Sequence, residues 1–295
     1  MLQSPAIALV PAVADRRRGG PATTGSTPQR TGRPATGTAV RAVGGCSSWP
    51  LPADATCAVV ARRRFRDAAA ALCLPAELAS DGLLMASELA ANTLHARVNV
   101  TLDSAGAWPI AGGPELWIYL RRAAGGWELA VKVFDSLSGW KDDLAPVPGA
   151  TGADAESGRG LQVVAELSAG RWGHHLTRSR FGGWKAPGKA VWFALPVPDG
   201  LVPEPLRQAR VAPGRAAWAL EEMLAERGLG EGLLRAQAPS TGMAVLSVRP
   251  GLTVWCRNDL IWWWTQDRLR CERAPTDLVE VAEQITCACA EMDPS

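Results

Sequence analysis

The strongest constraint on the fold is a pair of alternating segments on either side of a two-glycine turn. Residues 115–121 alternate Leu and Ile with Trp and Tyr, and residues 127–134 alternate Trp, Leu and Val with Glu, Ala and Lys. Successive side chains of a strand point to opposite faces, so each segment is predicted to be a β-strand. Because Gly125 and Gly126 separate the two segments, the sequence predicts a β-hairpin.

Helical patterns precede and follow this hairpin. Apolar residues recur at helical spacing from residue 53 and again over 76–95, with Pro75 between the two predicted helices. The other predicted elements of this region are strands at 98–103, 171–177 and 190–195 and a helix at 160–167. This order indicates an α/β (α+β) two-layer sandwich, in which a mixed, mostly antiparallel sheet carries helices on one face.

Composition divides the chain of 295 residues into three parts. Residues 1–47 are rich in Pro, Gly, Thr, Ala and Arg without periodicity, which predicts a disordered tail. This tail holds six Arg and one Asp, so it is the basic part of a chain whose formal net charge is only +2. Residues 53–198 form the main predicted domain, and Pro196 and Pro198 begin a linker.

A smaller, Trp-rich α+β domain is predicted for residues 206–292. Its predicted elements are a helix at 206–227, strands at 244–248, 252–256, 260–265 and 268–272, and a final helix at 276–290. Three of the thirteen Trp are consecutive, so Trp262 and Trp264 would share one face of a strand and Trp263 the other. Arg and acidic residues are mixed around them, which favours buried packing or a protein interface over base stacking.

Composition and patterning exclude several classes of protein. The small net charge argues against a nucleic-acid partner for the folded part, so any such attraction is expected only in the basic tail. Seven Cys without a Cys-x-x-Cys pair predict neither a disulfide framework nor a zinc site. No apolar run reaches the roughly 18 residues of a membrane span, and the Arg cluster follows the apolar start, so we expect no membrane association and a cytoplasmic protein.

Polar residues suited to nucleotide chemistry occur at three places. Glu88 and Asn92 are four apart and would project from one face of the helix at 76–95. A carboxylate can accept a proton and an amide oxygen can ligate Mg²⁺, although the same spacing is typical of a solvated helix face. Asp135 follows the second strand of the hairpin, where it could accept a hydrogen bond from an amino group or simply initiate a turn.

The third place is the end of a long polar loop, residues 136–158. Gly158 and Gly160 flank Arg159 at the start of a predicted helix. Glycines permit close backbone approach, and free N–H groups at a helix start attract phosphate. The segment is therefore a candidate phosphate loop, although an ordinary loop that leads into a helix has the same pattern.

In this order the three places resemble the N, G1 and G2 boxes of the GHKL ATPase superfamily, which includes gyrase, Hsp90, histidine kinases and MutL. The residues are most similar to the anti-sigma-factor serine kinase-like branch of the actinobacterial type. Residues 87–96 resemble its box helix, residues 156–164 its second glycine box and residues 188–196 its closing strand. The resemblance covers residues 55–198 and implies a histidine kinase-like ATPase fold.

The resemblance implies a site for ATP and Mg²⁺. Glu88 would be the general base for phosphoryl transfer, Asn92 would hold Mg²⁺, and Asp135 would bind the adenine amino group. Catalysis in such a site consists mostly of positioning and charge stabilisation. The implied partner is a sigma factor or an antagonist protein in transcription regulation, and a homodimer is compatible with the same features.

The resemblance also implies contacts near the phosphates. Gly139, Gly158 and Gly160 would let a lid close on the nucleotide. Leu161 would follow with a backbone N–H directed toward phosphate. Arg159 would either reach a phosphate or remain solvated.

Two departures from the family pattern leave turnover open. Leu137 stands where the kinases usually have the first glycine of the G1 box, and Ala190 stands where the closing strand often has Thr. A missing hydroxyl would weaken binding by about 1 kcal/mol. The sequence therefore predicts ATP binding and leaves serine/threonine kinase activity undecided. The alternative is a non-catalytic, nucleotide-dependent interaction module whose C-terminal domain is the partner surface.

Overall fold

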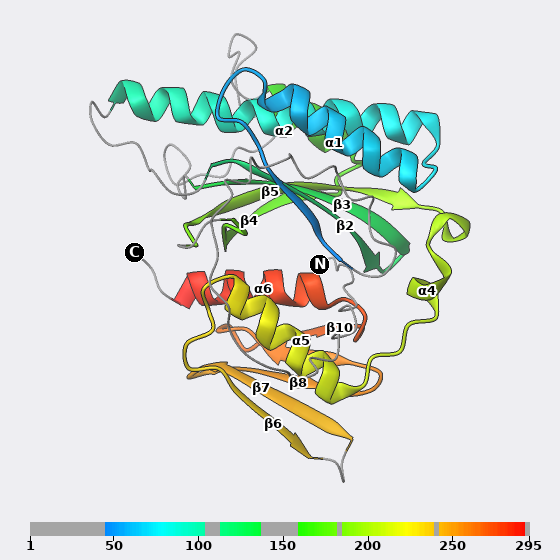
Figure 1. The fold of residues 1–295 in the computed structure, drawn as a ribbon, viewed down its shortest axis with the longest axis vertical. Coiled ribbons are helices and arrows are strands. Elements are labelled where there is room, and N and C mark those ends of the chain that lie inside the picture. Colours follow the sequence, from blue (N-terminus) through cyan, green and yellow to red (C-terminus); the bar gives the residue numbers. More distant parts are fainter. Residues whose placement is uncertain (1–44, 104–112, 137–158, 182–184, 239–241, 293–295) are drawn as a thin grey trace, which may run out of the picture.

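The structure, a computed structural model, describes residues 45–103, 113–136, 159–181, 185–238 and 242–292. The protein is α+β, with two antiparallel sheets of five strands each (Figure 1), and this confirms the predicted fold class. Sheet A consists, in spatial order, of β1 (Ser47–Pro50), β2 (Glu115–Ala123), β3 (Gly126–Asp135), β5 (Pro187–Val197) and β4 (Trp172–Arg178).

The predicted hairpin is confirmed as β2 and β3. The two strands pair in antiparallel register from Glu115 opposite Phe134 to Ala123 opposite Gly126. Gly126 has a φ of +126°, which L side chains rarely adopt, so glycine is required where the turn enters β3. The hairpin lies at the centre of sheet A, between β1 and β5.

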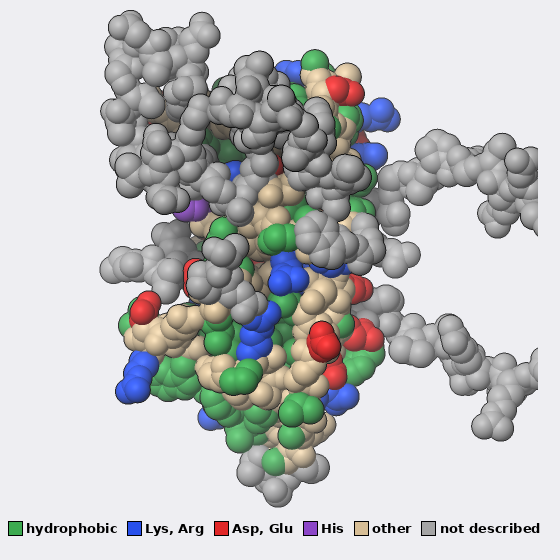
Figure 2. Space-filling model, turned by 90° about the vertical axis from the view of Figure 1, so that its left-hand side faces the viewer, with side chains coloured by type: hydrophobic (Ala, Val, Ile, Leu, Met, Phe, Trp, Pro, Cys, Tyr) green, Lys and Arg blue, Asp and Glu red, His purple; other side chains and the backbone are tan. Residues whose placement is uncertain are grey.

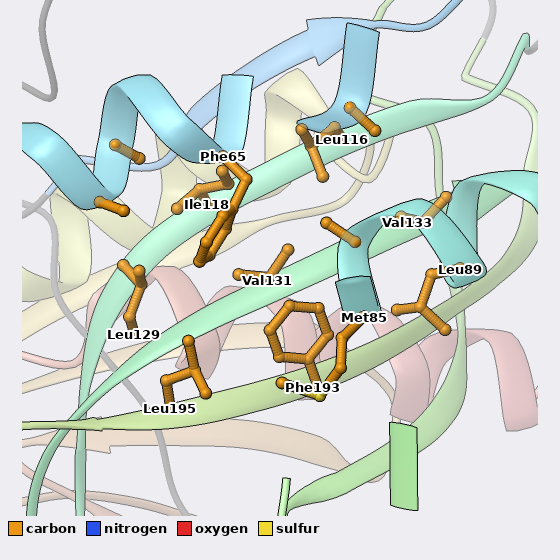
Figure 3. Close-up of a cluster of buried hydrophobic side chains, with 14 of the residues drawn as sticks. Phe65, Met85, Leu89, Leu116, Ile118, Leu129, Val131, Val133, Phe193 and Leu195 are labelled. Carbon is orange, nitrogen blue, oxygen red and sulfur yellow. The ribbon is translucent and has the colours of Figure 1, made fainter. Parts of the chain in front are cut away.

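Three helices cover one face of sheet A: α1 (Cys57–Ala71), α2 (Ala76–Asp103) and α3 (Arg159–Leu167). Figure 3 shows part of the core between them, with Phe65, Met85 and Leu89 from the helices and Val131, Val133, Phe193 and Leu195 from the strands. Phe65 packs against Phe193 with ring centroids 6.3 Å apart. A Cβ at Gly82 would lie 2.1 Å from the Phe65 ring, so glycine lets α2 pass close to α1.

The C-terminal part is built around sheet B. After the short helices η1 (Asp199–Leu201) and α4 (Glu204–Arg207) come α5 (Pro213–Glu226), β6 (Leu234–Ala238), β7 (Met243–Arg249), β8 (Leu252–Cys256), β9 (Ile261–Trp264), β10 (Arg270–Arg273) and α6 (Leu278–Met292). The strand order is β10-β9-β8-β7-β6, and α5 and α6 cover one face of this sheet with a second hydrophobic core.

Helix α6 joins the two parts because it also lies against the face of sheet A that α1, α2 and α3 leave open (Figure 1). This contact is polar and buried. Lys132 of β3 donates from Nζ to Glu280 Oε2 at 3.0 Å, and the Tyr119 hydroxyl donates to the same carboxylate. Thr177 of β4 donates to Glu283 at 3.2 Å. The molecule therefore consists of four layers: helices, sheet A, helices and sheet B.

Several predicted elements differ from the observed ones. The predicted strand at 98–103 is wrong, because α2 continues to Asp103 and the edge of β2 is paired with β1 instead. The predicted helix at 206–227 is interrupted, because α5 begins anew at Pro213, whose missing N–H is tolerated only in the first turn. Strands β1 and β6 were not predicted, and β1 begins at the last residue of the predicted tail.

The longest helix, α2, has 28 residues. In the part of the chain that the structure describes, neither this helix nor any other combines the length and the apolar character needed to cross a membrane.

Candidate functional site

The structure brings Glu88, Asn92 and Gly160 together. Glu88 and Asn92 are half-buried on α2, and Gly160 lies in the first turn of α3, which packs beside α2. A Cβ at Gly160 would lie 2.7 Å from Glu88 Oε2 and 3.4 Å from Asn92 Oδ1. A side chain at this position would make the Glu88 carboxylate move, so glycine lets α3 begin directly against these two polar groups as they are arranged.

Leu161 anchors the start of α3. Its side chain is 5% exposed and belongs to the core under the three helices, as does Val164. The first N–H groups of a helix have no partner within it, and this end carries the positive pole of the helix dipole. The start of α3 is therefore chemically suited to an anion. Arg159 is the first residue of α3, but its side chain lies outside the described residues.

Asp135 forms a second group with Lys189. The two residues are register partners at the end of β3 and the start of β5, and Asp135 Oδ2 lies 3.6 Å from Lys189 Nζ. The Asp135 side chain is buried. Burial lowers the pKa of Lys189, and the charge of Asp135 opposes that shift. Gly188 makes the approach of the strands feasible, because a Cβ there would lie 2.2 Å from the Asp135 carbonyl oxygen.

The two groups lie on the same side of sheet A and toward the same end. Side chains alternate along β3, so Asp135 points to the helix-covered face, as do Val131 and Val133 of the core. Figure 3 shows Val133 beside Leu89 of α2 at one end of that core. Leu89 is adjacent to Glu88 in the chain, so the α2 pair and Asp135 share this region.

Sequence reasoning gave no role to Lys189 or His174. Leu176 of β4 is the register partner of Lys189, and His174 lies two residues before it, so His174 is on the same face as Lys189. Burial and then the positive charge of Lys189 lower the pKa of His174. The next residue, His175, points to the opposite face, where its Nε2 lies 3.0 Å from Lys132 Nζ. The sequence places Lys189 directly before the predicted strand at 190–195, which indicates that it lies near a strand end. Its pairing with Asp135 could not be predicted, because that pairing depends on the register of β5 against β3.

Three residues of the expected glycine boxes, Leu137, Gly139 and Gly158, lie outside the described residues. Ala190 is described, and it packs with Trp117 and Phe134 on the face of sheet A opposite Asp135. A Thr hydroxyl at this position would point into that buried cluster rather than toward Asp135. The weaker binding expected from Ala190 therefore does not follow from this geometry.

The arrangement offers a carboxylate, an amide oxygen and a helix start within contact distance, and a buried carboxylate at the same end of the sheet. Over residues 45–103, 113–136, 159–181, 185–238 and 242–292, no group of three or more His, Cys, Asp and Glu side chains is arranged to hold a metal ion. A Mg²⁺ ion bound with a nucleotide keeps several waters and needs one or two protein ligands. Asn92 and the cradle at Gly160 fit such a group.

Comparison with known proteins gives no match: no protein-family model, no curated protein and no solved structure is matched by this chain. The structure itself establishes an α+β fold with two antiparallel sheets.

Proposed function

We propose that this protein binds ATP with Mg²⁺ and acts as a regulatory protein of the GHKL type, similar to the anti-sigma-factor serine kinases. The observation that supports the proposal most is the contact of Gly160 with Glu88 and Asn92. These residues belong to the two boxes that would hold the metal and the phosphates, and they come from separate helices. A phosphate group is attracted to such a helix start by its free N–H groups.

Each polar group has a role in this proposal. The Asn92 amide oxygen ligates Mg²⁺, and the backbone at Gly160 and Leu161 binds phosphate. Asp135, held by Lys189, accepts a hydrogen bond from the adenine amino group. Glu88 would accept the proton of an attacking hydroxyl, whose oxygen bonds to the γ-phosphorus of ATP while the bond to the β-phosphate breaks and ADP leaves. The partner would be a sigma factor or an antagonist protein in the cytoplasm.

Calorimetric titration with ATP and Mg²⁺ tests the binding step. We expect binding by the natural protein and a loss of about tenfold in affinity for Asp135→Asn, because the amide no longer offers two acceptor oxygens. Asp199→Asn is the matched control, since this exposed residue lies in η1, outside sheet A. If the natural protein shows no binding heat, the proposal is wrong.

Glu88→Gln separates catalysis from binding. The amide is isosteric but cannot accept the proton, so we expect ATP affinity to be retained and phosphoryl transfer to a partner protein to fall by about a hundredfold or more. Unchanged transfer would show that Glu88 is not the base.

The second candidate is a non-catalytic module, in which nucleotide only sets the conformation that a partner binds. The observation that favours it is the exposed aromatic face of sheet B, where Trp264 is 45% exposed. Two results together would support this module over the kinase. The protein would capture a partner only in the presence of ATP, and it would transfer no phosphoryl group to any partner that it captures.

A further inference from the structure

The face of sheet B that points away from α5 and α6 is unusually apolar for an uncovered sheet face. Antiparallel sheets with one solvated face normally alternate apolar residues inward with polar residues outward. Here the outward positions, none of which is buried, are Leu234, Ala236, Ala238, Met243, Val245, Ser247, Thr253, Trp255, Trp262, Trp264, Arg270 and Glu272. We call this surface the outer face. Figure 2 shows hydrophobic side chains at the surface of the lower part of the molecule, where sheet B lies.

The side chains on the two halves of the outer face differ in size. On β8 and β9, Trp255 stacks on Trp262 with ring centroids 6.0 Å apart and an angle of 9° between the rings, and Trp264 is 45% exposed beside them. On β6 and β7 four of the six outward positions carry smaller residues, Ala236, Ala238, Val245 and Ser247, and the other two are Leu234 and Met243. The outer face therefore has an aromatic half with large side chains on β8 and β9, and a low half with mostly smaller side chains on β6 and β7.

Charge on the outer face is confined to the β10 edge. Arg270 Nε lies 2.9 Å from Glu272 Oε1, and the Arg270 guanidinium stacks on Trp262 with a distance of 5.5 Å to the ring centroid. A nucleic acid or an anionic membrane surface requires an excess of Lys and Arg. This face has one cation and one anion, so it suits a flat, apolar and uncharged partner surface.

We propose that the outer face binds a second copy of this chain. Two antiparallel sheets pack face to face with their strands nearly aligned. A two-fold axis that runs along the strands between β7 and β8 would place the Trp half of each copy over the Ala and Val half of the other. Large residues then meet small ones, and the paired Arg270 and Glu272 remain at the solvated rim. This inference does not depend on nucleotide binding.

Sedimentation over about a hundredfold range of protein concentration tests the proposal, because a dimer dissociates on dilution. We expect a species of twice the 31.2 kDa chain mass at the upper end. Trp264→Glu introduces charge at an exposed position on the aromatic half of the contact and should weaken dimerisation by about tenfold or more. Val59→Glu is the matched control, since Val59 is 55% exposed on α1, at the opposite end of the molecule, and should leave the dimer unchanged.

Leu234→Glu provides a second variant on the low half, where the side chain is 71% exposed and contributes little to folding. It should also produce monomer, and circular dichroism identifies any variant that has lost its fold. Hydrogen exchange over residues 252–264 should slow as the natural protein is concentrated. A natural protein that is monomeric throughout, or a dimer that survives both face variants, overturns the proposal. A monomer that binds vesicles of neutral phospholipid through this face also overturns it.

Discussion

At the scale of single residues, Gly160 is the position where the smallest change has the clearest expected effect. Gly160→Ala places a Cβ 2.7 Å from Glu88 Oε2, so the carboxylate or the start of α3 must move. Because both belong to the candidate site, we expect ATP affinity to fall by about tenfold. Titration calorimetry with ATP and Mg²⁺ measures this change.

Gly200→Ala is the control for Gly160→Ala, because a Cβ at Gly200 would meet no atom within 4 Å. It should leave ATP affinity unchanged. If both variants bind ATP as the natural protein does, Gly160 has no part in a nucleotide site.

The adjacent residues His174 and His175 predict a pH dependence that can be assigned to one side chain. Burial and the nearby Lys132 lower the pKa of His175 from 6.5 to about 3. Below pH 6.5 the unfolded chain therefore binds a proton at His175 that the folded protein does not, so the free energy of unfolding falls as the pH falls. At pH 4.5 this loss is about 3 kcal/mol.

His175→Gln should remove this contribution of about 3 kcal/mol, most of which arises between pH 6.5 and 4.5, as measured by the difference from the natural protein in urea unfolding at several pH values. This window avoids Glu280, whose pKa is lowered from 4.5 to about 2 by Lys132 and Arg121 despite its burial. His174→Gln is the control, since His174 lies on the other face and is more exposed. An equal flattening by both variants would contradict the assignment to His175.

At the scale of elements, the contact between α6 and sheet A depends on buried ion pairs. Glu280→Gln leaves the Lys132 ammonium buried without its counter-charge, and we expect a loss of about 3 kcal/mol in the free energy of unfolding. Lys132→Met combined with Glu280→Leu should recover part of it, because both charges of the pair are removed while the Tyr119 hydroxyl and His175 lose their partners. Urea unfolding of both variants provides the measurement.

The matched control for this contact is Glu272→Gln on β10. Its ion pair with Arg270 joins side chains that are 43% and 49% exposed, so its removal should change the free energy of unfolding by less than about 1 kcal/mol. Equal losses for Glu272→Gln and Glu280→Gln would show that the α6 contact does not depend on buried charge.

The elements that sequence reasoning predicted well are those with a local pattern. The hairpin at Gly125 and Gly126 follows from strict alternation, and the helix at Arg159–Leu167 follows from its glycine start. The six-residue alternation at 98–103 was misleading because β1, far away in the chain, takes the free edge of β2. In the candidate site, Glu88 and Asn92 were found from helical spacing, whereas Lys189 depends on strand register.

At the scale of the whole molecule, the two sheets are not independent, and their contact could not be predicted from sequence. Lys132 and Tyr119 meet Glu280 across 148 and 161 positions of the chain. Hydrophobic periodicity is a local pattern, so it does not indicate which residues pair over such a separation in the chain. In the sequence, Lys132 is one of several polar residues on an alternating strand, and the buried carboxylate that it requires lies on the last helix.

We therefore expect that a chain shortened at the predicted domain boundary, Pro198, loses stability. A chain that ends at Pro198 lacks α6 and Arg227, and it exposes a sheet face on which Trp117, Tyr119, Lys132 and Arg121 are at most 1% exposed. The Arg227 guanidinium lies over the Trp117 ring, 4.5 Å from its centroid. We expect the shortened chain to aggregate on size-exclusion chromatography or to melt at a clearly lower temperature.

A chain that ends at Met292 is the control, because it keeps all of α6 and should match the full chain. If the chain that ends at Pro198 is a monomer with an unchanged melting temperature, the buried contact is not what holds sheet A in its folded form.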